Sequence, residues 1–564
     1  MALLRTLFCL VAAVAAVPAP QAATSTSSAA ASACTGNTAS DRSVWCDYSI
    51  DTNYYDEVPN TGVTVEYWFE VTNTTAAPDG VERMILAVNG SVPGPRIEAN
   101  WGDTVRIHVT NSLTNNGTGI HWHGIRQNYT NQEDGVPSIT QCPIAPGESY
   151  TYEWRATQYG TSWYHSHYSL QAWNGVFGPM VIHGPATANY DEELDTIVLN
   201  DWTWQTSDEK YNFAETNGPF SLDNGLINGK NTWGDGGSRY ENNFESGKSY
   251  RLRIVNAAID THFKFALDGH SFKVIAMDFV PIVPFDATVL DITMGQRYDI
   301  IIEADQDATD YWMRAVPQGE CSANNNSADI RAIIRYDSTS TSLPTSTAYD
   351  DMTNDLCDDM PIASLVPHLS QTVVDPVEDS DLPVSVSTNE NNLFKWQIGM
   401  NSMLVQWADP SLLSIMEGNA TFQDAENVYS LPDANKWVYF VIESAIAVPH
   451  PIHLHGHDYF VLAAERDATY DSSVTLNLVN PPRRDVVNLP VSGYLVIAFL
   501  TDNPGTWLMH CHIGWHTSEG LALQFVERES EIPALLNQQT MSDTCSAWHS
   551  WADTVGIEEE DSGV

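Results

Sequence analysis

Histidines recur along this chain at a spacing that suits metal binding. Four His-x-His pairs occur, and they are His121 with His123, His165 with His167, His453 with His455, and His510 with His512. Side chains two residues apart on a strand point to the same face, so each pair can direct two imidazoles at one metal site. One pair is a weak signal. Four pairs, two near each end of the chain, predict a metal cluster shared between its two ends.

The last pair encloses a cysteine, and His516 follows four residues later. On an extended backbone Cys511 points away from its two neighbours, so one short segment can serve two metal centres. A thiolate with imidazoles, and many imidazoles without carboxylates, favour copper. Zinc is the competing metal, but a zinc site holds about four ligands and needs no thiolate joined to a histidine cluster. For this segment alone, a surface histidine cluster beside a disulfide cysteine is the simpler alternative.

The elements that would position these residues read mostly as short strands. Apolar and β-branched segments are separated by Gly, Pro, Asn and Asp, few segments have helical periodicity, and 493–525 reads largely as buried strand. The expected strands include 63–71, 104–110, 149–154, 180–183, 250–256, 263–267, 273–277, 299–304, 437–443, 459–463 and 494–500. This pattern is typical of β-sandwiches or barrels.

The order of the motifs predicts a threefold internal repeat. In each third of the chain a strand leads to a His-containing segment, and a Trp-bearing strand follows later. The middle third lacks the paired histidines, so we expect it to be a spacer and a substrate wall. We expect three domains at 62–185, 186–345 and 390–564, with a linker at 346–389 and an N-terminal extension or propeptide at 24–61.

The N-terminus indicates an exported protein, and the net charge limits its partners. Residues 1–23 read as a secretory signal peptide whose apolar core is too short to span a membrane. Lys and Arg total 25 against 72 Asp and Glu, and this net charge of -47 disfavours nucleic acid and anionic membranes. We expect a secreted, extracellular monomer. Six Asn-x-Ser/Thr sequons fit a glycoprotein, and they lie at Asn73, Asn89, Asn116, Asn128, Asn325 and Asn419.

Cysteine usage fits the same compartment. Cys9 lies in the signal peptide, which leaves seven cysteines and therefore an odd thiol, for which Cys511 is the candidate. The other six allow fifteen pairings. Closeness in sequence favours Cys34–Cys46 and Cys321–Cys357, and we take Cys142–Cys545 as the third pair.

Together, the four motifs resemble those of multicopper oxidases, in particular laccases of the ascomycete fungal type. They read His121-Trp-His-Gly124, His165-Ser-His167, His450-Pro-Ile-His-Leu-His455 and His510-Cys-His-Ile-Gly-Trp-His516, within a match over roughly 34–564. The resemblance implies an all-β fold of three consecutive cupredoxin-like Greek-key β-barrel domains, which agrees with the repeat. It also implies four copper ions: one type 1, one type 2 and a type 3 pair.

The resemblance also implies which residues hold each copper. The type 1 ion would be held by His450, Cys511 and His516. The type 2 ion would be held by His121 and His453. The type 3 ions would take His123, His165 and His512 on one side, and His167, His455 and His510 on the other. Leu521 stands at the family's axial position, ten residues after the cysteine, and offers no ligand, which implies a raised type 1 potential.

The implied reaction is the one-electron oxidation of phenols or aromatic amines, coupled to the reduction of dioxygen to two waters. Asp134 matches the family's proton-delivering Asp, although a turn residue before Gly is an alternative. Asp260 would accept the phenol proton. The implied pocket walls are Phe394, Trp396, Trp515 and the edge of His516, where the aromatic residues are otherwise core residues. The ending 561–564 resembles a tail that enters the cluster channel in such laccases, with a frayed acidic tail as the alternative.

Other functions remain open at this stage. A ferroxidase needs acidic residues around the type 1 site, and ascorbate or bilirubin oxidases are expected to carry Met where Leu521 stands. A non-catalytic copper-binding protein would use exposed Met- and His-rich tracts, and the sequence has none. The biological role, such as lignin degradation, pigment synthesis or detoxification, does not follow from the sequence.

Overall fold

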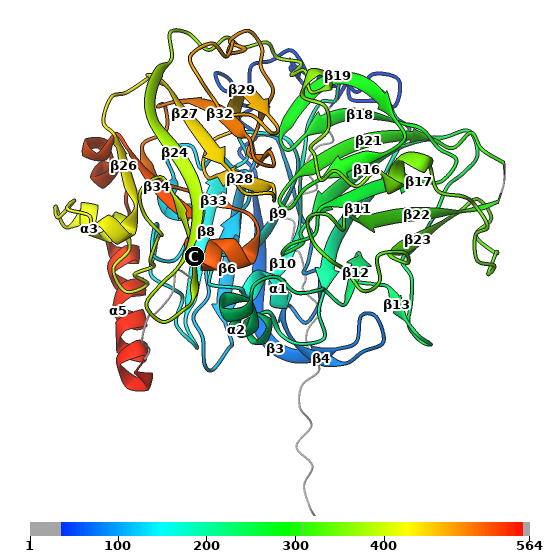
Figure 1. The fold of residues 1–564 in the computed structure, drawn as a ribbon. Helices are drawn as coiled ribbons and strands as arrows, with labels where there is room; N and C mark the ends of the chain where they lie inside the picture. The colour runs from blue at the N-terminus through cyan, green and yellow to red at the C-terminus, as the bar shows by residue number, and fades with distance from the viewer. Residues whose placement is uncertain (1–34, 308, 557–564) are drawn as a thin grey trace, which may run out of the picture.

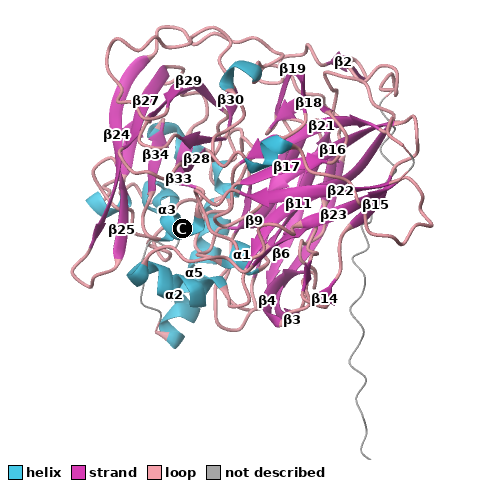
Figure 2. Cartoon of the chain, turned by 45° about the vertical axis from the view of Figure 1, so that its right-hand side comes forward, coloured by secondary structure: helices cyan, strands magenta, loops and turns pink. Residues whose placement is uncertain are grey.

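The computed structural model describes residues 35–307 and 309–556. Within these residues the chain is built mainly of strands, which form six sheets of four or more strands and two small two-stranded ones. The large sheets pair into three units that follow one another along the chain (Figure 1). Figure 2 shows the strands in magenta and the few helices in cyan. The predicted all-β architecture with three units is confirmed. The expected signal peptide and the tail at 561–564 lie outside the described residues.

The first unit pairs the sheets β4-β3-β6-β8 and β5-β10-β9-β7. Its strands are β3 (Thr64–Ala76), β4 (Arg83–Val88), β5 (Ile97–Asn100), β6 (Thr104–Asn111), β7 (Ile120–Trp122), β8 (Ser149–Arg155), β9 (Gly160–Ser166) and β10 (Phe177–His183). Strand β8 shows why these segments form strands, since Tyr150, Tyr152 and Trp154 alternate with exposed polar residues and face the core. Ile50 and Tyr54 join this core, so the described part of the expected N-terminal extension packs on the first unit.

The middle unit pairs β12-β11-β16-β21-β18-β19 with β15-β23-β22-β17-β20, and Figure 1 shows it in green. Its strands are β11 (Glu192–Trp202), β12 (Asn224–Ile227), β15 (Glu241–Asn243), β16 (Ser249–Asn256), β17 (Phe263–Leu267), β18 (Phe272–Met277), β19 (Val280–Ala287), β20 (Leu290–Ile292), β21 (Arg297–Glu303), β22 (Asp310–Pro317) and β23 (Arg331–Arg335). The small strands β1 (Val44–Trp45), β2 (Tyr48–Ser49), β13 (Thr232–Trp233) and β14 (Gly236–Gly237) make the two-stranded sheets.

The third unit pairs β25-β24-β27-β32-β29-β30 with β26-β34-β33-β28-β31. Its strands are β24 (Val377–Thr388), β25 (Phe394–Ile398), β26 (Val428–Leu431), β27 (Trp437–Ser444), β28 (His450–Leu454), β29 (Tyr459–Glu465), β30 (Arg483–Arg484), β31 (Val486–Leu489), β32 (Tyr494–Leu500), β33 (Gly505–Cys511) and β34 (Ala522–Glu527). Strand β24 falls inside the expected linker, because its buried Leu382 and Val384 pack in the core and it pairs with β27. The exact domain boundaries stay a prediction.

Helices are few in the part of the chain that the structure describes, as expected. They are α1 (Gln171–Asn174), α2 (Ser207–Asn217), α3 (Ser411–Met416), α4 (Gly514–Ser518) and α5 (Gln538–Val555), with 3-10 turns η1 (Asn131–Asp134), η2 (Asp350–Thr353), η3 (Ile362–Ser364), η4 (Asp424–Glu426) and η5 (Glu529–Ala534). The buried strand expected over 493–525 is therefore interrupted by α4. Among the residues described, no helix has the length and apolar character needed to cross a membrane.

Two disulfides tie distant segments together. Cys142 of the first unit is bonded to Cys545 of α5, with 5.0 Å between their Cα atoms. Cys321 is bonded to Cys357, with 6.2 Å between Cα atoms. Cys34 lies outside the described residues, so its expected pairing with Cys46 stays a prediction. Helix α5 is thereby fastened to the first unit across 403 residues of sequence.

Candidate metal centres

The first centre surrounds the one described cysteine that forms no disulfide, Cys511. It ends β33, which pairs with β28, where His450 begins the strand. Helix α4 follows and places His516 beside Cys511 and His450. The Cys511 Sγ lies 3.9 Å from Nδ1 of His450 and 3.7 Å from Nδ1 of His516. These three ligand atoms could hold one metal ion.

Burial sets the properties of this centre. It raises the pKa of the Cys511 thiol, which stays protonated unless a metal or another cation stabilises the thiolate. It also lowers the pKa of His450 to about 3, which keeps this imidazole neutral. Leu521 is fully buried in the core that contains Cys511, and its main-chain oxygen accepts a hydrogen bond of 3.0 Å from the Cys511 N–H.

Only His516 of this centre is partly exposed, and aromatic residues surround it. The ring centroid of Trp396 lies 4.1 Å from that of His516 and 4.9 Å from that of His450. The Trp396 Nε1 donates to Glu519 at 2.9 Å, which fixes the indole. Trp515 is nearly buried, and Phe394 is half-buried at the start of β25. Of the aromatic residues expected to form the pocket, Trp396 is in ring contact with His516.

Asp260 is the carboxylate expected beside this centre. Its Oδ2 accepts a hydrogen bond from the Ser322 hydroxyl at 3.2 Å. Burial raises the pKa of Asp260 to about 8, the nearby Asp201 carboxylate adds to this rise, and hydrogen bonds from Ser322 and Trp515 oppose it. The hydrogen bond between Asp260 and Trp515 places the carboxylate next to the residue that precedes His516.

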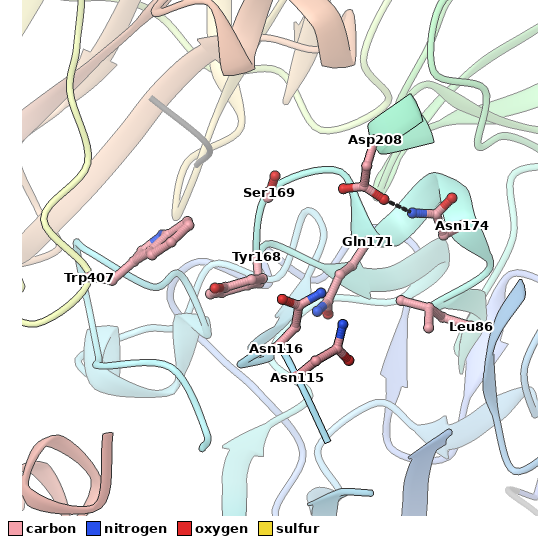
Figure 3. Close-up of a pocket in the computed structure, with 9 residues that line it drawn as sticks. All are labelled: Leu86, Asn115, Asn116, Tyr168, Ser169, Gln171, Asn174, Asp208 and Trp407. Atoms are coloured by element: carbon pink, nitrogen blue, oxygen red, sulfur yellow. Dashed lines mark hydrogen bonds between the residues drawn. The ribbon is translucent and has the colours of Figure 1, made fainter. Parts of the chain in front are cut away.

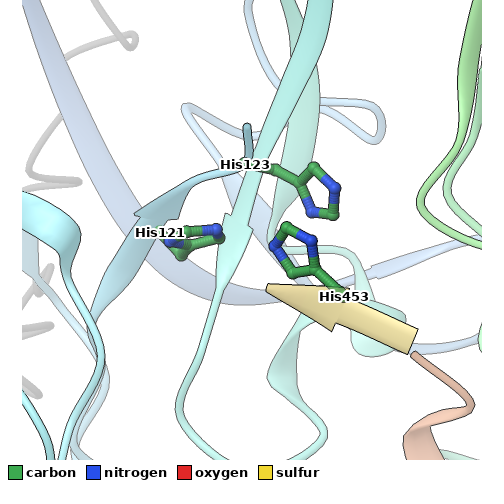
Figure 4. A group of neighbouring side chains, drawn as sticks. All are labelled: His121, His123 and His453. Atoms are coloured by element: carbon green, nitrogen blue, oxygen red, sulfur yellow. The ribbon is translucent and has the colours of Figure 1, made fainter. Parts of the chain in front are cut away.

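The second centre gathers all eight histidines of the four pairs. In β7 and β9 His121 stands opposite His165, and in β28 and β33 His453 stands opposite His510. These two strand pairs belong to the first and third units, and together they bring the histidines into three groups. The groups are His123, His165 and His512; His167, His455 and His510; and His121, His123 and His453. Within each group the ligand atoms lie within 4.8 Å of one another, and Figure 4 shows the last group.

In four of these imidazoles, those of His121, His123, His165 and His453, one ring nitrogen is hydrogen-bonded and the other is buried without a partner. Nδ1 of His121, His165 and His453 pairs with main-chain oxygens at 3.0, 3.0 and 2.8 Å, while their Nε2 atoms are buried without a partner. In His123 the buried nitrogen without a partner is Nδ1. An unpaired buried polar atom is costly, about 1–3 kcal/mol. Metal ions at this place would satisfy these nitrogens, so the residues fit a metal cluster.

The protonation of the cluster also suits metal binding. Burial, with the neighbouring imidazoles, lowers the pKa well below the usual histidine value for His123, His165, His167, His453, His455 and His512. Neutral imidazoles carry a lone pair that a metal can accept. Three groups made of imidazoles alone, beside one thiol centre, fit copper.

Asp134 bridges two of these histidines. It ends the turn η1, and its carboxylate lies 3.2 Å from Nδ1 of His121 and 2.8 Å from Nδ1 of His455. Gly135 follows at φ +80°, where an added Cβ would overlap the main-chain oxygen of Ile120. The turn can therefore approach the strand that carries His121. The predicted carboxylate is thus buried in contact with the cluster.

Comparison with known proteins agrees with this arrangement. Family models described as multicopper oxidase match residues 70–187, 193–339 and 386–531, one in each unit. The chain belongs to the multicopper oxidase family. Laccase-2 of Botryotinia fuckeliana is 49% identical over 94% of this chain and 93% of its own length. Laccase-1 of Melanocarpus albomyces is 38% identical over 94% of this chain and 89% of its own.

A solved structure has the same fold. The laccase from Botrytis aclada covers 94% of this chain and 100% of its own, with a TM-score of 0.90 and 48% identity. The three units of this multicopper oxidase are therefore cupredoxin domains, and the chain is an oxidoreductase with copper as its cofactor.

Sequence reasoning missed several residues of the two centres in this multicopper oxidase. Ser322 and Glu519 hold Asp260 and Trp396, and Phe220 stands edge-on to Trp515 with ring centroids 5.2 Å apart. Nothing in their local sequence marks them. Asp485 does carry a local signal, because this charged residue stands directly after two arginines and directly before Val486 and Val487.

A separate cavity of about 310 Å³ opens beside the first unit of this multicopper oxidase (Figure 3). Its walls include Tyr168, which follows His167 in the chain, and Trp407, whose ring is stacked on that of Tyr168 with centroids 4.5 Å apart. None of the residues expected to contact the substrate lines this cavity. The expected substrate pocket at His516 is therefore a different place.

Proposed function

We propose that this multicopper oxidase is a secreted laccase. It would oxidise phenols or aromatic amines one electron at a time and reduce dioxygen to two waters. The observation that carries the proposal is the place of Cys511, whose side chain lies with His450 and His516. Its main chain continues directly into His510 and His512, which belong to two different histidine groups.

We assign four copper ions to these groups. His450, Cys511 and His516 would hold the type 1 ion, and His121 and His453 the type 2 ion. The type 3 pair would lie with His123, His165 and His512, and with His167, His455 and His510. When bound, copper takes single electrons from an organic donor and delivers four of them to dioxygen. The buried, unpaired nitrogens support this assignment.

The chain itself connects the two centres. The peptide from Cys511 to either neighbour is covalent, and the Cys511 main-chain oxygen accepts a hydrogen bond from Nδ1 of His510 at 2.8 Å. From the Cys511 sulfur to the His510 ring, the path through this hydrogen bond crosses fewer bonds than the covalent path through the peptide and the His510 side chain. Leu521, with only carbon atoms in its side chain, would leave the type 1 ion without an axial ligand and raise its potential.

Asp260 would remove the proton of the donor. A phenol that loses an electron becomes strongly acidic, so a nearby base avoids a high-energy radical cation. The raised pKa makes the Asp260 carboxylate a better base than an ordinary aspartate. Phe394, Trp396 and Trp515 would hold the aromatic ring at the exposed edge of His516.

Asp134 would supply protons on the dioxygen side. Four protons are consumed for each dioxygen reduced to water, and the cluster is buried, so a carboxylate within it is required to relay them. The contacts of Asp134 with His121 and His455 support this role.

The alternatives are disfavoured by the same geometry. The aromatic residues around His516 suit an organic ring, whereas a ferroxidase needs a site lined with carboxylates. A copper carrier or storage protein would expose its ligands, whereas the eight cluster histidines are buried. We also propose that the protein is a monomer, that it binds neither nucleic acid nor membranes, and that it is glycosylated at the six sequons.

The decisive experiment combines metal analysis with optical and spin-resonance spectra, followed by oxygen uptake. We expect four coppers per chain, an intense blue thiolate band, and oxygen uptake with a phenol. Fewer coppers or no blue band would contradict the proposal. Oxygen uptake with iron(II) but not with phenols would move the function to ferroxidase.

A further inference from the structure

The described residues of the middle unit include no candidate ligand, yet one of its arginines reaches the histidine cluster. Arg297 begins β21 and is fully buried. Its Nη1 and Nη2 donate to Oδ1 and Oδ2 of Asp485 at 2.5 and 2.6 Å. Asp485 stands between β30 and β31 of the third unit. Two parallel hydrogen bonds between an arginine and a carboxylate fix orientation as well as charge.

Arg297 is itself held by three segments. Its Nε donates to the main-chain oxygen of Thr161 in the first unit at 3.2 Å, and its Nη1 donates to that of Gly295 at 3.1 Å. Its main-chain N–H donates to Asp278 at 2.9 Å. The guanidinium therefore has one position, where all three units meet.

Asp485 in turn contacts two candidate ligands from different units. Its Oδ1 lies 3.3 Å from Nε2 of His123, and its main-chain oxygen lies 2.8 Å from Nδ1 of His453. The two imidazole rings are stacked, with centroids 3.9 Å apart and planes 8° apart. Figure 4 draws both rings. One residue thus holds both members of this stack.

These contacts select the nitrogen that each ring offers to a metal. A neutral imidazole has one N–H and one lone pair, so the nitrogen that donates to Asp485 leaves the other free. The free nitrogen is Nδ1 in His123 and Nε2 in His453, and both are buried without a partner. The same aspartate therefore sets opposite tautomers in the two rings.

Two glycines keep the space that this arrangement needs. A Cβ at Gly124, which follows His123, would lie 2.4 Å from Nη2 of Arg297 and 2.5 Å from Oδ2 of Asp485. A Cβ at Gly295 of the middle unit would lie 2.8 Å from Cδ2 of His512. Both glycines have positive φ, +78° and +82°, which other residues rarely adopt. The last residue of the His-Trp-His-Gly motif thus makes room for the ion pair.

We propose that the Arg297–Asp485 ion pair is a positioning device for the copper cluster. It holds His123 of the first unit and His453 of the third in the stacking and tautomers that present Nδ1 and Nε2 to the metal. The middle unit is then part of the frame of the cluster as well as a spacer. This inference rests on the ligand assignment of the proposed function.

The test compares copper retention in substituted enzymes. The variants are Arg297→Met, Arg297→Lys and Asp485→Asn. The matched control is Arg314→Met, since Arg314 also forms two hydrogen bonds of 2.8 Å with an aspartate of the middle unit, Asp268. Each holoenzyme is dialysed against increasing chelator, and the readouts are copper per chain, the type 2 spin-resonance signal and the blue band.

We expect the Arg297 and Asp485 variants to lose cluster copper at about 10- to 100-fold lower chelator concentration while keeping the blue band. The Arg314→Met control should retain copper like the unsubstituted enzyme. Cluster copper held as firmly in Arg297→Met and Asp485→Asn as in the control would overturn the inference. If Arg297→Met does not fold, Arg297→Lys decides in the same way, because it keeps the charge but lacks the paired hydrogen bonds. Fewer than four coppers in the unsubstituted enzyme would instead overturn the proposed function, and the inference with it.

Discussion

Replacing Asp260 with Asn tests whether this carboxylate takes the proton of a phenol. Burial raises the pKa of Asp260 to about 8, with Asp201 adding to the rise and Ser322 opposing it. The reactive form is the carboxylate, and below this pKa its fraction falls about tenfold for each pH unit, to about 1% at pH 6. The kcat/KM of the unsubstituted enzyme for a phenol should therefore rise by about tenfold per pH unit towards pH 8.

The assay is oxygen uptake between about pH 5 and 8 with a phenol and, as a control donor, ferrocyanide, which loses an electron but no proton. Asp260→Asn should flatten the phenol profile and lower kcat/KM near pH 8 by about 10²- to 10⁴-fold, the usual contribution of a general base. Rates with ferrocyanide should be unchanged, since copper and His516 are untouched. An unsubstituted enzyme whose phenol and ferrocyanide profiles run parallel would refute the reasoning. So would a phenol slope that survives in Asp260→Asn.

Three further predictions concern other parts of the molecule. Leu521→Met should lower the type 1 potential in a redox titration, because a thioether can donate where Leu cannot; an unchanged potential would argue against the axial assignment. Asp134→Asn should slow reoxidation by dioxygen by about 10²-fold or more in stopped-flow experiments while leaving reduction of the blue copper unaffected; equal slowing of both steps would point to a structural role. Trp154→Ala, in the buried core of the first unit, should lower the free energy of unfolding by about 3–5 kcal/mol in urea denaturation; a loss below about 1 kcal/mol would show that the core relaxes around the missing ring.

Local sequence determined the strands and what they could carry. The alternation of Tyr150, Tyr152 and Trp154 with polar residues predicts β8, because successive side chains of a strand face opposite sides whatever lies around it. The same rule places each His-x-His pair on one face. The histidines on either side of Cys511 mark it as the thiol that forms no disulfide, and the structure leaves it without one. These features depend on residues a few positions apart, so they can be read without a fold.

Local composition misled where long-range packing decides. The Asp- and Ser-rich composition of residues 377–388 predicts a linker, yet they form β24, because Leu382 and Val384 pack in a core beside β27. Residues 493–525 read largely as buried strand, yet helix α4 forms within them and brings His516 back to within 3.7 Å of the sulfur.

The local spacing leaves each pair free to face a site of its own, and only the number and order of the pairs predict a shared cluster. The tertiary structure forms this cluster, because β7 and β9 pack against β28 and β33, more than 280 residues later. The contact of the middle unit with the cluster is likewise not predicted by the sequence. Arg297 belongs to no recognisable sequence motif. It matters because it binds Asp485, 188 positions away, which contacts the imidazoles of His123 and His453. Backbone periodicity is a local property, whereas such contacts exist only once three domains have packed together.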